Sequence, residues 1–152
     1  MTPAELAALL PLPAFPATGR ELARVAGQQA TAALITHWGG QKWPVPVMSE
    51  LSRDDARNRY AELVALVGST AAAQIVRHYG GRPLYVPNCK KVRHQLAQLR
   101  LVRDYEELLA QGLSSAAAVF KLGPRYGLSG RQIEARVNAP TSIPEKMQAD
   151  LF

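Results

Sequence analysis

The sequence contains the same segment twice, at a constant offset of 41 residues and without a gap. Residues 20–46 read RELARVAGQQATAALITHWGGQKWPVP, and residues 61–87 read AELVALVGSTAAAQIVRHYGGRPLYVP. A histidine, a glycine pair and a Val-Pro pair recur at equivalent positions of the two copies. Self-similarity at a fixed offset is typical of a duplicated structural unit. We therefore expect the first half of the chain to fold as two related units.

Each copy predicts a helix followed by a short strand. The helix ends at an aromatic residue, Trp38 or Tyr79, before the glycine pair, because glycine adopts the left-handed cap conformation without steric cost. The following segments, KWPVPV and PLYVP, are rich in β-branched and aromatic residues, which favour strands. Their prolines remove backbone donors and confine such strands to an edge or a short pair. We expect a two-stranded ribbon, formed within this chain or with a second chain.

Composition and apolar periodicity predict a mainly α-helical fold. Much of the apolar fraction of 47% is alanine and leucine, which favour helix. Thr18 with Glu21, and Ser52 with Asp55, have the spacing of capping boxes at helix starts. The expected helices cover residues 19–37, 53–67, 70–79 and 90–111.

Several classes of function find no support in the sequence. Cys89 is the only cysteine, which excludes an intrachain disulfide and a thiolate metal cluster. His37 and His78 could share a metal ion, but we expect each to cap the end of its helix, with no metal bound. No nucleophile, acid–base pair or phosphate loop is recognisable, so we expect neither catalysis nor a cofactor. Without a signal peptide or a run of roughly 18 apolar residues, we expect a cytoplasmic protein that does not enter a membrane.

The formal charge excess lies entirely in the second half of the chain. Residues 1–76 contain six basic and six acidic residues, whereas residues 77–152 contain twelve basic and six acidic ones. This asymmetry indicates a polyanionic partner for the second half, most simply nucleic acid. A solvated basic surface is the alternative.

The segment SSAAAVFKLGPRYGLSGRQIEARVN, residues 114–138, has the pattern of a helix-turn-helix. We expect Ser114 to cap a first helix, Gly127 to form a tight turn and Ser129 to cap a second helix with Ile133 facing inward. In helix-turn-helix proteins the second helix enters the major groove of DNA. The alternative is an ordinary helical hairpin with a solvated charged face.

The basic and amide side chains of this region predict contacts to DNA. Arginine makes bidentate contacts to guanine and glutamine to adenine, while other basic residues contact phosphates. Pro124 falls in the last turn of the first helix, where proline removes a donor, so we expect the hairpin to be shortened or opened there. The predicted DNA-binding residues are Lys90, Lys91, Arg93, Lys121, Arg125, Ser129, Arg131, Gln132 and Arg136.

Residues 75–137 resemble the middle operon regulator (Mor) family of phage transcription activators. The resemblance rests on the glycine pair followed by Tyr-Val-Pro, then a long helix, then the helix-turn-helix pattern, in that order. It implies a dimeric activator that binds double-stranded DNA, with RNA polymerase as a further partner. It also implies that Leu84, Tyr85 and Val86 lie in the dimerisation strand.

The sequence departs from the family pattern in two places. The first copy adds a strand that could replace the strand of a partner, giving a pseudo-dimer within one chain instead of a homodimer. NAPTSIPE stands where the family has a strongly basic run, and fewer phosphate contacts lower the affinity for DNA.

The last five residues, QADLF, resemble the motif by which bacterial and phage proteins bind the replicative sliding clamp (the β subunit). Leu151 and Phe152 would fill an apolar pocket, Gln148 would hydrogen-bond its rim, and Asp150 fits the pattern. The preceding APTSIPEKM has the composition of a linker. The alternative is that the two apolar residues fold back onto the domain.

These observations predict a mainly α protein with a short two-stranded β element from the duplicated units and a C-terminal helix-turn-helix. Residues 1–88 form the duplicated region, residues 89–139 the long helix with the DNA-binding region, and residues 140–152 the tail. We expect a transcription regulator tethered to the sliding clamp. The alternative is a clamp-binding adaptor or inhibitor with a vestigial helix-turn-helix, which would bind DNA little at any salt concentration.

Overall fold

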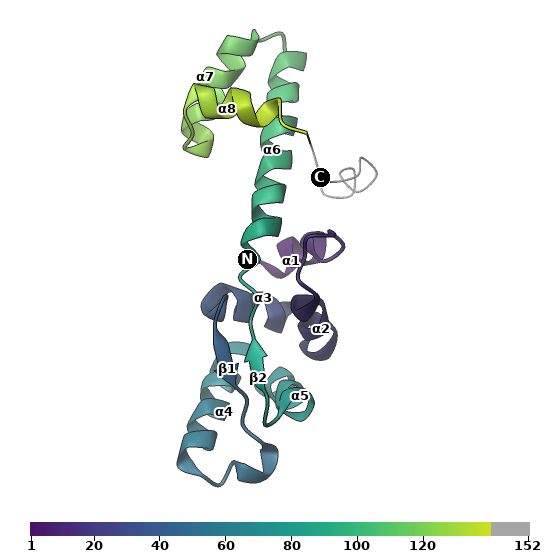
Figure 1. The fold of residues 1–152 in the computed structure, drawn as a ribbon, viewed down its shortest axis with the longest axis vertical. Coiled ribbons are helices and arrows are strands. Elements are labelled where there is room, and N and C mark those ends of the chain that lie inside the picture. Colours follow the sequence, from purple (N-terminus) through teal and green to yellow (C-terminus); the bar gives the residue numbers. More distant parts are fainter. Residues whose placement is uncertain (141–152) are drawn as a thin grey trace. The chain divides into compact units, whose positions relative to one another are not determined.

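The computed structural model describes residues 1–140, and the QADLF motif lies outside the described residues. The described part is mainly α, as predicted, with eight α-helices and one two-stranded antiparallel sheet (Figure 1). The chain divides into two compact units, of which the first covers Met1–Lys90 and the second begins at Lys91. Within residues 1–140, none of the helices combines the length and the apolar character that crossing a membrane requires.

The elements follow one another in a simple order (Figure 1). The first unit contains α1 (Pro3–Leu9), α2 (Ala17–Ala26), α3 (Gln28–Trp38), β1 (Lys42–Pro44), a 3-10 turn (Met48–Glu50), α4 (Asp54–Val67), α5 (Ser69–Tyr79) and β2 (Pro83–Tyr85). The second unit is built from α6 (Lys90–Ala110), α7 (Ser115–Tyr126) and α8 (Gly130–Val137).

The predicted helices at 53–67, 70–79 and 90–111 are present as α4, α5 and α6, with ends that agree within one residue. The single helix predicted over residues 19–37 is wrong, because the chain breaks at Gly27 into α2 and α3. Gly27 has a φ of 85°, a conformation that an L side chain rarely adopts. Gly68, at the equivalent position of the second copy, has a φ of 86° and separates α4 from α5.

The two predicted capping boxes at Thr18 and Ser52 do not form. The N-cap of α2 is Pro16 and the N-cap of α4 is Arg53, and neither makes a side-chain hydrogen bond to its helix. Thr18 lies inside α2, and Ser52 lies before the N-cap of α4. Both pairs of residues have the spacing of a capping box, but neither Thr18 nor Ser52 is the residue at which its helix begins.

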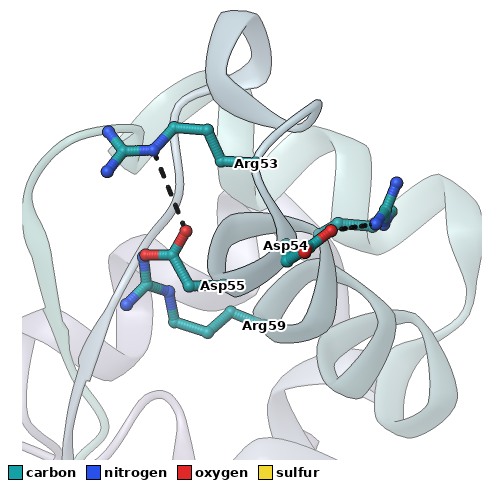
Figure 2. A network of polar contacts seen from close by, with 5 residues as sticks. Arg53, Asp54, Asp55 and Arg59 are labelled. Carbon is teal, nitrogen blue, oxygen red and sulfur yellow. Dashed lines mark hydrogen bonds and ion pairs between the residues drawn. The ribbon is translucent and has the colours of Figure 1, made fainter.

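Acidic side chains and arginines meet at the start of α4. Asp55 lies 3.9 Å from Arg53 and 3.3 Å from Arg59 (Figure 2). Asp54 forms an ion pair with Arg57. Carboxylates in the first turn interact favourably with the positive end of the helix dipole. Because these side chains are exposed, apart from the half-buried Arg59, each pair contributes little to stability.

The strands of the two copies pair with each other within the chain. β1 and β2 are antiparallel, with Trp43 opposite Leu84. Trp43 and Leu84 are buried, whereas the neighbouring pair of Lys42 and Tyr85 is exposed. The Trp43 ring also stacks on Trp38, with 5.2 Å between ring centroids. The ribbon therefore has one face in the core and one face in solvent.

Equivalent residues of the two copies build the core of the first unit. Helix α2 packs on α3 and α5, and helix α4 also packs on both. Leu22 and Leu63, which are related by the offset of 41 residues, are fully buried, and so are Leu34 and Ile75. Each copy thus completes the core of the other.

We expect Leu84→Ala to destabilise the first unit by about 2–5 kcal/mol, because it removes buried methyl groups and leaves a cavity. Leu84 is 3% exposed. The matched control is Tyr85→Ala, at a side chain that is 56% exposed and should cost less than about 1 kcal/mol.

Urea unfolding followed by tryptophan fluorescence measures both variants, since both tryptophans, Trp38 and Trp43, lie in this unit. Equal destabilisation by the two substitutions would contradict the assignment of the ribbon faces.

Candidate nucleic-acid interface

Three helices of the second unit pack around a small apolar core. Leu101 of α6, Val119 and Leu122 of α7, and Ile133 of α8 are buried together. The inward orientation predicted for Ile133 is confirmed. Further side chains that pack against this cluster are Tyr105, Leu108, Tyr126, Leu128 and Val137. This core fixes α7 and α8 against α6.

Three residues join α7 to α8. Gly127 adopts the left-handed conformation, with φ 63° and ψ 33°, as predicted for a tight turn. The backbone N–H of Leu128 donates to the carbonyl of Gly123 at 3.0 Å. A Cβ on Gly123 would lie 3.0 Å from the carbonyl oxygen of Leu128, which leaves almost no room for a side chain. Two glycines therefore allow α8 to approach α7 closely.

Serines cap both helices, as predicted. The Ser114 hydroxyl accepts from the backbone N–H of Ala117 at 3.2 Å. The Ser129 hydroxyl accepts from the backbone N–H of Gln132 at 3.3 Å, and the Gln132 Oε1 accepts from the backbone N–H of Ser129 at 2.9 Å. This reciprocal pair is a capping box. The Gln132 side chain, predicted to contact a base, is therefore occupied in starting α8.

Pro124 does not open the hairpin, contrary to expectation. Helix α7 continues through it to Tyr126. Pro124 lies on the exposed side of α7 together with Phe120, which is 82% exposed. Water can hydrogen-bond the Phe120 carbonyl, which would otherwise accept from residue 124. The missing donor is therefore tolerated at this position.

A buried carboxylate connects α6 to the end of α7. Asp104 is 6% exposed and accepts a hydrogen bond from the Tyr126 hydroxyl at 2.6 Å. Arg125 and Arg103 lie 3.3 and 3.4 Å from its two oxygens. A buried charge is stable only when it is paired and hydrogen-bonded, and Asp104 has three such partners. Arg125, predicted to contact a phosphate, is thus engaged by Asp104.

This environment changes the ionisation of Tyr126. Burial, followed by the hydrogen bond to Asp104 and the negative charge of that carboxylate, raises the pKa of Tyr126 to about 12. All three causes favour the neutral phenol, because the phenolate would be poorly solvated and would face a carboxylate. Tyr126 therefore remains a hydrogen-bond donor throughout the physiological pH range.

The exposed side of α8 differs in part from the predicted set. Arg131 and Gln132 are exposed, as expected, and so are Glu134, Ala135 and Asn138. Arg136 is half-buried, and its backbone carbonyl accepts a hydrogen bond from the Gln98 side chain of α6. Helical periodicity puts residues three and four apart on one side, so Arg131, Glu134 and Ala135 of α8 share a face with Asn138, its C-cap residue. We call these four residues the α8 outer face.

The other predicted residues lie on α6, α7 and the ribbon. Lys121 is exposed on α7. Lys90, Lys91 and Arg93 are exposed in the first turn of α6. Lys91 and Arg93 lie roughly 8–11 Å along the helix axis from Gln98, the α6 residue that hydrogen-bonds α8. In the ribbon of the first unit, Leu84 and Val86 are buried and Tyr85 is exposed.

His78 contacts an acidic side chain of another helix. The His78 Nε2 lies 3.0 Å from Glu21 Oε1 of α2, so its ring contacts this carboxylate and not the helix end where a cap was expected. Within residues 1–140, no group of three or more His, Cys, Asp or Glu side chains is arranged to hold a metal ion.

An open apolar groove runs between α7 and the start of α8. Sequence reasoning missed this groove, although Ala116, Phe120 and Pro124 recur at the four-residue spacing that predicts one helix face. The groove is lined by Ala116, Val119, Phe120, Gly123, Pro124, Gly127, Leu128, Gly130 and Glu134.

Comparison with protein families gives one match. The sequence model of the Mor transcription activator family matches residues 47–151, which is more than half of the chain. The match contains α4, α5, β2 and all three helices of the second unit, and it extends the resemblance recognised over residues 75–137. Comparison with curated proteins and with solved structures gives no match.

We expect Tyr126→Phe to lower the free energy of unfolding at neutral pH by about 1–3 kcal/mol, because it removes a hydrogen bond to a charged acceptor. The folded-state pKa of Tyr126 lies above the ordinary value of 10.0. The stabilisation is therefore fully present below about pH 10 and is lost as the pH rises towards about 12.

Urea unfolding followed by far-ultraviolet circular dichroism, repeated across this range, measures both effects. The difference between wild type and Tyr126→Phe should shrink between about pH 10 and about pH 12. A constant difference would contradict the raised pKa of Tyr126.

Proposed function

The chain belongs to the Mor transcription activator family, and from this premise we propose that it activates transcription by placing α8 in the major groove of double-stranded DNA. The family is one of transcription regulators and not of enzymes. In this proposal α7 and α8 act as a helix-turn-helix, with α8 as the recognition helix. The observation that carries it is the α8 outer face, an exposed set of side chains on a helix held by a buried core.

The chemistry of the α8 outer face fits the edges of base pairs. Arg131 can bind guanine O6 and N7, and Asn138 can bind adenine N6 and N7. Glu134 can accept from the N4 amino group of cytosine, and Ala135 can contact a thymine methyl group. Gln132 and Arg136 are less suited to this role, because one caps α8 and the other is half-buried.

Phosphate contacts would come from exposed basic residues of α6 and α7. Lys121 on α7 and Lys91 and Arg93 on α6 are exposed cations. Arg125 would contribute less, since Asp104 holds its guanidinium at 3.3 Å. Residues 91–140 contain eight basic and four acidic residues. This modest excess favours DNA binding with a measurable but shallow dependence on salt.

An activator of transcription acts on RNA polymerase as well as on DNA. We therefore include RNA polymerase as a second partner, and a phage or prophage promoter as the setting, which follows from the resemblance of residues 75–137. The apolar groove beside Phe120 is also lined by Gly130 and Glu134 of α8, and Glu134 belongs to the α8 outer face.

The same proposal includes tethering through the tail. Gln148, Asp150, Leu151 and Phe152 fit the sliding-clamp motif in sequence. A clamp-bound activator would couple transcription to replication. If the chain binds the clamp and shows no salt-dependent affinity for DNA, the alternative of a clamp-binding adaptor or inhibitor replaces the activator.

We expect Arg131→Ala to weaken binding to the preferred duplex by about 1–3 kcal/mol and to relax the preference at one base pair. Lys121→Ala should weaken binding to every duplex and reduce the salt slope by about one. Fluorescence anisotropy with labelled duplexes, titrated at several salt concentrations, measures both.

The matched control is Arg57→Ala, which removes the same charge from α4 and should leave DNA binding unchanged. Arg57 belongs to the exposed ion pairs of the first unit. Equal losses from Arg131→Ala and Arg57→Ala would show that binding reflects net charge alone, and the recognition role of α8 would be wrong.

Removal of Leu151 and Phe152 should abolish binding to the bacterial sliding clamp and leave DNA binding intact. Fluorescence polarisation of the labelled full chain against the clamp, with the truncated chain as control, measures this. Two apolar anchors in one pocket carry most of the affinity of such a contact. Clamp binding that survives the truncation, or that neither chain shows, rules out the QADLF contact.

A further inference from the structure

We infer that the first unit is a complete two-fold pair made from one chain, so that the protein is a monomer and recognises a single DNA site without two-fold symmetry. The inference about DNA rests on the proposed function. The inference about the monomer rests on the ribbon and on the packing of the two copies alone.

Reciprocal hydrogen bonds relate the two copies. The Gly40 N–H donates to the Val86 carbonyl at 2.8 Å, and the Gly81 N–H donates to the Val45 carbonyl at 3.2 Å. Gly40 and Gly81 are equivalent positions of the two copies, and so are Val45 and Val86. This exchange of identical contacts is what a two-fold axis imposes on two subunits. Here both sides belong to one chain.

A second pair of backbone hydrogen bonds is also related by the repeat. The Val86 N–H donates to the Gln41 carbonyl at 3.0 Å, and the Val45 N–H donates to the Arg82 carbonyl at 3.3 Å. Gln41 and Arg82 are again related by 41 residues. The helices follow the same rule, since α2 packs on α5 and α3 packs on α4. The contacts between copies are therefore satisfied within the chain.

The first copy lies outside the region that matches the family. That match begins at residue 47, after β1, so it contains the second copy and everything that follows. The first copy supplies the strand and helices that pair with the matched region. It occupies the surface of the second copy at which another chain would otherwise have to pack.

Prolines close the outer edges of the ribbon. In an antiparallel pair, backbone N–H groups alternate between the partner strand and the outer edge. Val45 and Val86 donate inward, so the residues on either side of them face outward. The outward positions of the two strands are Lys42, Pro44, Pro46, Pro83, Tyr85 and Pro87. Because four of these six have no N–H, a third strand from another chain could not form a regular ladder.

Because the two-fold pair forms within one chain, the protein recognises a DNA site of different symmetry. Within residues 1–140 only the second copy continues into α6, α7 and α8, whereas the first copy continues into α4. A two-fold dimer carries two recognition helices and binds two symmetric half-sites one turn of DNA apart. One chain with one α8 outer face reads a single half-site.

Sedimentation equilibrium of the full wild-type chain tests the monomer directly. We expect the mass of one chain, 16.5 kDa, from low to high micromolar concentration. Twice this mass at micromolar concentration would overturn the inference. No variant is needed, so loss of folding cannot confuse the result.

Selection of bound duplexes from a random library by the full chain, followed by native mass spectrometry of the selected complex, tests the DNA class. We expect one chain on a sequence without two-fold symmetry. Two chains on a symmetric sequence would overturn this part. If no sequence is selected and the chain shows no salt-dependent affinity for random duplex, the proposed DNA binding is wrong, and so is the single asymmetric DNA site. The oligomeric state is then still decided by the sedimentation experiment.

Discussion

The pairing of β1 with β2 is the constraint on which the first unit depends. Each strand has three residues, and an isolated pair of this length has no stability of its own in water. The ribbon exists because Trp43 and Leu84 are buried in the core of the first unit, where the Trp43 ring stacks on Trp38 of α3. The helices of the two copies in turn need each other, since both helices of each copy pack on a helix of the other copy. Neither copy can therefore keep its fold without its counterpart.

In the second unit, the contacts that hold α7 and α8 in place also engage some of their polar side chains. A helix of eight residues is too short to persist alone, so Ile133 in the core and the capping box at Ser129 must hold it. The capping box occupies Gln132, and the carboxylate of Asp104 engages Arg125. Gln132 thus helps to start α8, and Arg125 joins α7 to α6. In the proposed function, base recognition therefore falls mainly to the α8 outer face.

Sequence patterns correctly predicted the features that depend on interactions between residues close together in the chain. The strands, the serine caps and the turn at Gly127 were all predictable from neighbouring residues. The break at Gly27 was also present in the sequence, because the repeat aligns it with Gly68, where two helices were predicted. The Ser-x-x-Gln spacing likewise identifies the capping box between Ser129 and Gln132. The contact of Asp104 with Tyr126 joins residues 22 apart through tertiary packing, and no local pattern indicates it.

If α8 is the recognition helix that we propose, a single copy of it limits the specificity of DNA binding that the protein reaches by itself. Each bidentate contact to a base contributes about 1–3 kcal/mol of discrimination, and the α8 outer face has only Arg131 and Asn138 for such contacts. A dimer would double this energy, but the monomer that we infer from the closed ribbon has no second recognition helix. A second attachment compensates without new base contacts, because a tethered site experiences an effective concentration in the millimolar range. A contact to RNA polymerase or to the sliding clamp would therefore supply, through proximity, the occupancy that a two-fold activator obtains from its second subunit.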